Sequence, residues 1–147
     1  MKTYDQLVAE IATQISELMP WDLAEKIENK EDLLLVDVRE AEEYNTMRIP
    51  NTINIPRGIL EAASEHGYDE THPQLVAARN QQLILVCRSG KRSCLAAYTL
   101  QLLGFNDVVS LKTGLRGWND YDQALVDQNN NEVDGDDAEE YLKPRAE

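Results

Sequence analysis

The chain has 147 residues, of which 42% are hydrophobic and 28% charged, and its formal net charge at pH 7 is −13. This length fits one domain with a hydrophobic core of its own. So large a negative charge argues against nucleic acids and anionic membranes as partners, since both require a basic surface. The two cysteines, Cys87 and Cys94, form neither a disulfide framework nor a paired zinc-binding motif, which predicts a reducing compartment and no metal site.

The beginning of the chain is predicted to be an added amphipathic helix, residues 1–17. Its apolar residues recur every three or four positions, which is the pattern of a helix packed on a core. A second helix is expected over residues 21–27, directly after Pro20. No secretion signal and no apolar run of membrane-spanning length is visible, so we expect a cytoplasmic protein.

Two buried strands are predicted in the first half of the chain. Residues 33–38 are apolar almost throughout, as in a strand covered on both faces of a parallel sheet, and residues 53–55 form a shorter strand. Asp37 and Arg39 lie at the end of the first of these strands. Because side chains alternate along a strand, these two share one face, and we interpret them as a structural ion pair or loop anchor rather than as catalytic groups.

A long connection follows, residues 57–82. It contains two stretches that predict short helices, residues 59–63 and 75–78, and Pro73 suits the first turn of the second helix. Loops of this length are often functional lids or binding surfaces. The equally acceptable alternative is that this segment is only a crossover connection between two strands, lengthened by extra short helices.

The most informative stretch is residues 83–93. Residues 83–86 form a third predicted buried strand, and a cysteine and a short basic loop precede a helix that begins at Ser93 and stops at Gly104. Cys87 therefore lies at the carboxyl end of a parallel strand, where open α/β sheets bind their ligands. Cys94, early in the helix, is interpreted as a small buried residue, although it could resolve an oxidised Cys87.

The loop after Cys87 is predicted to activate the thiol. A strand-to-helix loop presents free backbone N–H groups to an anion, and nearby cations favour the thiolate, which is the nucleophilic form of cysteine. We therefore predict Cys87 as the catalytic nucleophile. The predicted substrate-binding residues are Arg88, Ser89, Gly90, Lys91, Arg92 and Ser93.

The last strand is predicted at residues 107–111 and a short helix at residues 115–121, with Trp118 in the core. Beyond residue 126 the sequence is too polar to bury a core. We therefore predict a domain over residues 1–126 and an acidic, flexible, solvated tail over residues 127–147, with residues 141–142 as a potential docking point.

Four motifs, in this order, resemble those of the rhodanese-like domain found in single-domain sulfurtransferases. The motifs are residues 33–40 with 42–44, residues 49–50 with 53–56, the cysteine loop 87–93 and residues 111–118. The family usually has Gly-His-Ile-Pro-Gly where this chain has Met47 to Asn51, and a glycine pair where it has Thr113 and Gly114. These departures concern local turns more than the chemistry of the loop.

The resemblance implies the rhodanese-like arrangement, a three-layer α/β/α fold with a mostly parallel sheet of about five strands. The family often has a short strand before its first helix, so residues 15–19 could be extended instead of helical. The alternation of strands and helices independently predicts an α/β fold. The resemblance also implies a thiosulfate sulfurtransferase without a cofactor, which moves a sulfane sulfur from thiosulfate or a persulfide to cyanide or a thiol through a persulfide on Cys87. Its partners would be a small anionic sulfur donor and a thiol or protein acceptor.

Two alternatives remain open at this point. One is a binding or regulatory module with slow turnover. The other is a cysteine-dependent phosphatase or arsenate reductase on the same fold. Such phosphatases need five residues between the cysteine and an arginine that closes a ring of donors around phosphate. Here only four residues separate Cys87 from Arg92, and Ser93 holds the arginine position. The shorter loop predicts a better match to a single sulfur atom than to phosphate.

Overall fold

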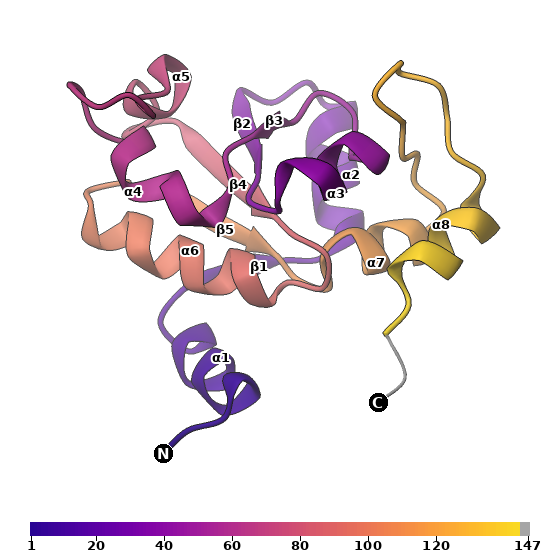
Figure 1. Cartoon of the computed structure of the whole chain (residues 1–147), viewed down its shortest axis with the longest axis horizontal. Coiled ribbons are helices and arrows are strands. Elements are labelled where there is room, and N and C mark those ends of the chain that lie inside the picture. The colour runs from indigo at the N-terminus through magenta and orange to yellow at the C-terminus, as the bar shows by residue number, and fades with distance from the viewer. Residues whose placement is uncertain (145–147) are drawn as a thin grey trace.

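A five-stranded parallel sheet forms the middle layer of the fold in the computed structural model, which describes residues 1–144 (Figure 1). The order of the strands across the sheet is β1-β5-β4-β2-β3. The strands are β1 Ser16–Leu18, β2 Leu33–Asp37, β3 Ile53–Asn54, β4 Gln82–Val86 and β5 Val108–Leu111. The predicted α/β class and five-stranded parallel sheet are confirmed.

The central strand β4 has an apolar core on each side. Leu83 and Leu85 point into one core and Ile84 and Val86 into the other, and all four are fully buried. This explains why the sequence here is apolar without alternation. Cys87, the next residue in the alternation, belongs to the same core as Leu83 and Leu85.

Helices cover both faces of the sheet, as Figure 1 shows. The core on one face takes residues from α4 (Leu60–Ala63), α5 (Pro73–Val76) and α6 (Lys91–Leu102), and the opposite core takes them from α2 (Pro20–Glu28), α7 (Gly114–Asp120) and α8 (Gly135–Leu142). The remaining helices are α1 (Tyr4–Ala12), α3 (Ala41–Thr46) and a 3-10 turn (Arg57–Ile59). Within residues 1–144, none of the helices has the length and apolar character that a membrane crossing requires.

The long connection between β3 and β4 contains the two predicted short helices, α4 and α5. Pro73 is the first residue of α5, as expected. Leu60, Ala63 and Leu75 of these helices are fully buried in the core beneath α6. This packing supports a crossover that contributes to the core, which was one of the two interpretations of this segment.

Helix α6 begins two residues earlier than the sequence predicted, at Lys91 instead of Ser93. Gly90 precedes it with a φ of +95°, and this left-handed conformation turns the chain directly from the loop into the helix. The first turn of α6 is therefore part of the cysteine loop. At the other end the predicted stop at Gly104 is confirmed, since the N–H of Phe105 donates to the carbonyl of Leu100 at 3.1 Å.

Two departures from the family pattern occur where the backbone is left-handed. Asn51 has a φ of +64° and Thr113 a φ of +70°. Both positions hold glycine in the usual motif, and glycine adopts this conformation without strain. Asparagine tolerates it well, whereas a β-branched threonine is unusual there. Both turns thus use a non-glycine residue in a conformation that glycine adopts most easily.

The N-terminal segment differs from the predicted helix over residues 1–17. Helix α1 ends at Ala12, and β1 follows, with Ser16 opposite Val109 and Leu18 opposite Leu111 of β5. The extended alternative for residues 15–19 is thus correct, because the free edge of β5 offers backbone partners that the isolated helix pattern does not reveal. No residue of α1 is buried, and α1 contacts α6 rather than the core.

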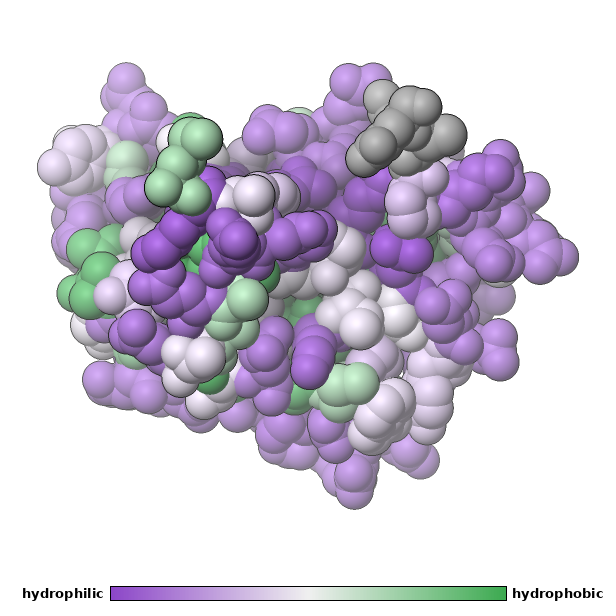
Figure 2. Space-filling view, turned by 90° about the horizontal axis from the view of Figure 1, so that it is seen from below, coloured by the Kyte–Doolittle hydropathy of each residue, from purple (hydrophilic) through white to green (hydrophobic). Residues whose placement is uncertain are grey.

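Figure 2, seen from below, shows hydrophobic residues scattered over a mostly hydrophilic surface.

The C-terminal segment also differs from the predicted solvated tail, over the part of it that is described. Asp134 caps α8 by accepting from the N–H groups of Asp136 and Asp137. Ala138 and Leu142 of α8 are buried in the same core as Trp118. Two apolar residues one helical turn apart therefore dock an otherwise acidic helix. Of the docking point expected at residues 141–142, Leu142 is buried and Tyr141 is exposed. Residues 145–147 of the predicted tail lie outside the described residues.

Candidate active site

Cys87 lies directly after β4, at the carboxyl edge of the sheet, and only 1% of it is exposed. Its Sγ accepts hydrogen bonds from the backbone N–H of Gly90 at 3.1 Å and of Ser93 at 3.4 Å. Two N–H groups directed at one sulfur atom stabilise its negative charge. The loop thus folds into the cradle that the sequence predicted, with the sulfur at its base.

A pair of buried serines extends this arrangement. Ser93 Oγ lies 3.4 Å from the Sγ of Cys87 and 2.7 Å from the Oγ of Ser110, and both serines are fully buried. When Cys87 is a thiolate, Ser110 can donate to Ser93, and the Ser93 hydroxyl can donate to the sulfur. Ser110 was missed from the sequence, although a lone serine in the apolar strand β5 was an available signal.

The start of α7 supports the cysteine loop through two backbone hydrogen bonds. The N–H of Leu115 donates to the carbonyl of Cys87 at 2.9 Å, and the N–H of Arg116 donates to the carbonyl of Arg88 at 3.1 Å. A Cβ on Gly114 would collide with the carbonyl oxygen of Cys87 and would lie 2.6 Å from the carbonyl carbon of Arg88. Only glycine therefore allows this close approach of the two strand-to-helix turns.

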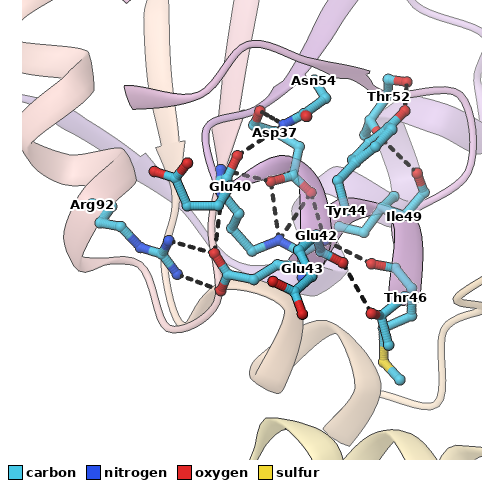
Figure 3. Close-up of polar contacts among 12 residues, drawn as sticks. Asp37, Glu40, Glu42, Glu43, Tyr44, Thr46, Ile49, Thr52, Asn54 and Arg92 are labelled. Carbon is cyan, nitrogen blue, oxygen red and sulfur yellow. Dashed lines mark hydrogen bonds and ion pairs between the residues drawn. The ribbon is translucent and has the colours of Figure 1, made fainter. Parts of the chain in front are cut away.

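The guanidinium of Arg92 forms a bidentate ion pair with Glu43 of α3, which Figure 3 shows. The two N–O distances are 2.8 and 2.9 Å. These hydrogen bonds lower the pKa of Glu43 and raise the pKa of Arg92. Arg92 thus ties the first turn of α6 to α3.

Arg88 is directed to the carboxyl end of α8. Its Nη2 donates to the carbonyls of Tyr141 at 3.1 Å and Lys143 at 2.7 Å, and its Nε donates to the carbonyl of Leu142 at 3.3 Å. The last carbonyls of a helix lack partners within the helix and attract cations. Arg88 therefore caps α8 and joins the cysteine loop to the C-terminal helix.

Lys91 is directed to α1. Its Nζ lies 2.6 Å from Oδ1 of Asp5 and 5.5 Å from the ring centroid of Tyr4. The hydrogen bond with Asp5 raises the pKa of Lys91.

The predicted binding residues therefore divide into two groups. The structure brings the N–H groups of Gly90 and Ser93 to the sulfur, and Ser89 is half-buried. The three cationic side chains contact other groups of the protein, and their predicted role in binding a donor anion stays a prediction. Their partners come from α1, α3 and α8, so the sequence of the loop alone gave no indication of them.

The ion pair predicted between Asp37 and Arg39 is present and completely buried. Arg39 donates to both carboxylate oxygens of Asp37, at 2.8 to 3.1 Å, and its Nη2 also donates to the carbonyl of Met47 at 2.7 Å. Asn54 completes the group by donating to the carbonyls of Asp37 and Arg39 (Figure 3). These contacts fix the turn after β2 and favour the structural interpretation of the pair.

Cys94 lies in α6 with only 1% of its surface exposed, and its Sγ is 3.8 Å from the carbonyl oxygen of Val8. Burial, with smaller contributions from the negative charges of Glu17 and Cys87, raises the pKa of Cys94 to about 11. Cys94 is therefore a protonated thiol at neutral pH, which agrees with its interpretation as a buried small residue.

The Glu43–Arg92 pair makes a testable contribution to stability. Because the pKa of Glu43 is lowered in the folded state, the pair stabilises the fold fully above the unfolded pKa, about 4.3, and this contribution is lost as the pH falls through the folded pKa. We expect Glu43→Gln to lower the free energy of unfolding by about 1 kcal/mol at pH 7, and by progressively less below about pH 4. Urea unfolding at several pH values measures this.

The matched control for that experiment is Glu42→Gln, which removes the same charge from an exposed position of the same helix. Glutamine at position 43 can still accept the hydrogen bond from the N–H of Glu40 that caps α3. If both variants lose the same free energy of unfolding, or if the loss for Glu43→Gln grows at low pH, the stability does not come from the Glu43–Arg92 ion pair.

Among the described residues, no group of three or more His, Cys, Asp or Glu side chains is placed to hold a metal ion. The chemistry available at the loop is that of the thiol, the backbone N–H groups and the two serines.

Known proteins share the sequence and the fold of this chain. The model of the Rhodanese-like domain family matches residues 19–121. The chain is 31% identical over 105 residues to YtwF, a proposed sulfurtransferase of Bacillus subtilis (strain 168), which covers 71% of this chain and 91% of that protein. It is 32% identical over 110 residues to YrkF, a proposed sulfur carrier protein of the same organism. That match covers 75% of this chain and 54% of YrkF, so the chain spans about half the length of that relative.

A solved structure agrees in fold. RPA3614 of Rhodopseudomonas palustris CGA009, a protein of unknown function described as a possible tyrosine phosphatase, superposes with a TM-score of 0.75 and 24% identity. The superposition covers 84% of this chain and 93% of that one. At this identity the likeness shows the fold alone.

Proposed function

Because the chain belongs to the rhodanese-like domain family, whose members include sulfurtransferases, we propose that it transfers a sulfane sulfur through a persulfide on Cys87. The observation that carries this proposal is the pair of backbone N–H groups, from Gly90 and Ser93, directed at the sulfur of Cys87. They stabilise a thiolate before the reaction. They are also placed to hold the persulfide that follows.

The reaction proceeds in two steps at one sulfur atom. The Cys87 thiolate attacks the outer, sulfane sulfur of the donor, a new S–S bond forms, and the S–S bond of the donor breaks. Sulfite from thiosulfate, or a thiolate from a persulfide, leaves with the electron pair. An acceptor such as cyanide or a thiol then attacks the outer sulfur, and Cys87 is released as a thiolate. This is covalent catalysis of the ping-pong type.

Hydrogen-bond donors around Cys87 supply the stabilisation that this mechanism needs. The N–H groups of Gly90 and Ser93 face the site where charge develops, and Ser93 with Ser110 adds a hydroxyl donor. The two free cysteines suit a reducing compartment such as the cytoplasm.

The proposal is tested by the intact mass of the protein after incubation with thiosulfate or with glutathione persulfide. We expect a gain of one sulfur atom with at least one donor, and its removal by cyanide as thiocyanate. The same preparation should leave aryl phosphates intact, because the loop lacks the fifth residue between Cys87 and an arginine. Hydrolysis of phosphate esters without any uptake of sulfur would favour the phosphatase alternative. Uptake of sulfur without transfer to an acceptor would favour a binding module.

A further inference from the structure

The positive charges of the catalytic loop are all matched by groups of the protein itself. Lys91 pairs with Asp5, Arg92 pairs with Glu43, and Arg88 binds the carbonyls at the end of α8. Thiosulfate is a dianion and releases the dianion sulfite, so its binding and reaction depend on cations that are free to contact it. An alkyl persulfide carries less charge and releases a single thiolate. A loop with matched charges therefore suits the persulfide better.

Helix α1 supplies the partners of Lys91, and it lies before residue 19, where the match to the family model begins. Its first turn is fixed by a capping box in which the side chains of Thr3 and Gln6 each bond the backbone N–H of the other. Tyr4 and Asp5 stand in this fixed turn. Both side chains reach Lys91, the first residue of α6.

The position of α1 close to the reacting sulfur has independent support. The carbonyl of Val8 contacts the thiol of Cys94, seven residues after Cys87. The pKa of Tyr4 is raised, first by burial and next by the negative charge of Cys87, while the charges of Arg92 and Lys91 oppose this. The Tyr4 phenol thus lies within the electrostatic field of the catalytic loop.

We propose that α1 selects the sulfur donor: Asp5 and Tyr4 engage Lys91, and Cys87 therefore takes sulfur from an alkyl persulfide in preference to thiosulfate. This inference rests on the proposed sulfur transfer. The Cys87 thiolate attacks the outer sulfur of the protonated persulfide, and a bond from Sγ to that sulfur forms. The S–S bond of the donor breaks, its thiolate leaves with the electron pair, and the proton stays on the transferred sulfur. Asp5 and Tyr4 act as positioning residues, since they work through Lys91.

The test compares kcat/KM for glutathione persulfide and for thiosulfate in the native protein and in Asp5→Asn. We expect the native protein to favour the persulfide by at least about tenfold, because Arg88, Lys91 and Arg92 are all engaged and one charge-assisted contact alone is worth about this much. Asp5→Asn should shift the ratio about threefold toward thiosulfate, which is the scale of an exposed ion pair. The shift should appear mainly as a lower KM for thiosulfate.

The matched control is Glu10→Gln, which removes the same charge from the same helix. Glu10 pairs with Lys2, and both side chains are well exposed. This variant should keep the native ratio, which separates a local effect on Lys91 from a change of net charge. In a Lys91→Ala background, Asp5→Asn should no longer shift the ratio.

The outcomes separate this inference from the proposed function. If Cys87 takes up sulfur but Asp5→Asn behaves like Glu10→Gln, or the native protein favours thiosulfate, donor selection by α1 is wrong and sulfur transfer stands. If neither donor loads Cys87, sulfur transfer itself is wrong and the inference falls with it.

Discussion

Replacing Cys87 by serine is expected to abolish the uptake of sulfur completely, because a serine hydroxyl cannot form a persulfide. The substitution preserves the size of the side chain and the donors from Gly90 and Ser93, so the fold should persist. Intact mass after incubation with either donor measures the effect, and circular dichroism checks the fold. Sulfur bound stably to the Cys87→Ser protein would show that another residue is the nucleophile.

The matched control is Cys94→Ser, the same substitution seven residues further along. Cys94 is protonated at neutral pH because burial raises its pKa to about 11, and its thiol is covered by α1. Serine at this position can donate a hydrogen bond to the carbonyl of Val8, which already lies near the sulfur. Cys94→Ser should therefore take up one sulfur atom as the native protein does. Loss of uptake in this variant with an intact fold would implicate Cys94 in the chemistry.

The second large effect is expected for Arg39→Met. This change leaves the buried carboxylate of Asp37 without its cation, and breaking a buried ion pair in this way costs about 3–5 kcal/mol. It also removes a donor to the carbonyl of Met47, which holds the chain after α3. The free energy of unfolding in urea measures the loss.

A suitable control is Arg57→Met. Arg57 is only half-buried, and its guanidinium makes a long contact, 3.4 Å, with the hydroxyl of Thr99. Its loss should cost about 1 kcal/mol or less. The double variant Asp37→Leu with Arg39→Met should recover much of the stability, because an apolar pair of similar volume avoids the cost of unpaired charge. A small loss for Arg39→Met alone would contradict the importance of the pair.

The core of the fold could be predicted from the sequence because its signals are local. The apolar run of β4 and the alternation that places Asp37 and Arg39 on one face depend only on neighbouring residues, and both were read correctly. The position of Cys87 followed from the strand that precedes it. The hydrogen bonds from Gly90 and Ser93 followed from the helix that begins after it.

The directions of the loop cations could not be predicted, because their partners lie far away in the sequence. Arg92 meets Glu43, Lys91 meets Asp5 and Arg88 meets the end of α8. Nothing in the loop sequence distinguishes a cation that faces substrate from one that holds a neighbouring helix.

The two ends of the described chain were harder to predict for another reason. Helix α8 buries only two residues, Ala138 and Leu142. Because the residues around them are acidic, the sequence predicted a solvated tail, although the two apolar residues have helical spacing. In the N-terminal segment the periodic pattern continued through Ile15 and Leu18, although β1 is extended there. Pairing with the edge of β5 makes this segment extended despite its helical pattern, and this pairing is visible only in the tertiary structure.

The pairing of β1 with β5 also sets the order in which the protein can assemble during synthesis. The first strand to leave the ribosome pairs with the last, so β1 waits until the rest of the sheet has emerged. Helix α1 is joined to β1 by residues 13–15, so the pairing of β1 with β5 holds α1 beside α6. In a nascent chain the cysteine loop would thus leave the ribosome before β5, which β1 needs as its partner, and the end of α8, which Arg88 caps, would leave later still. The contacts that α1 and α8 make with the cations of the loop would form only after β2 and β4 can pair.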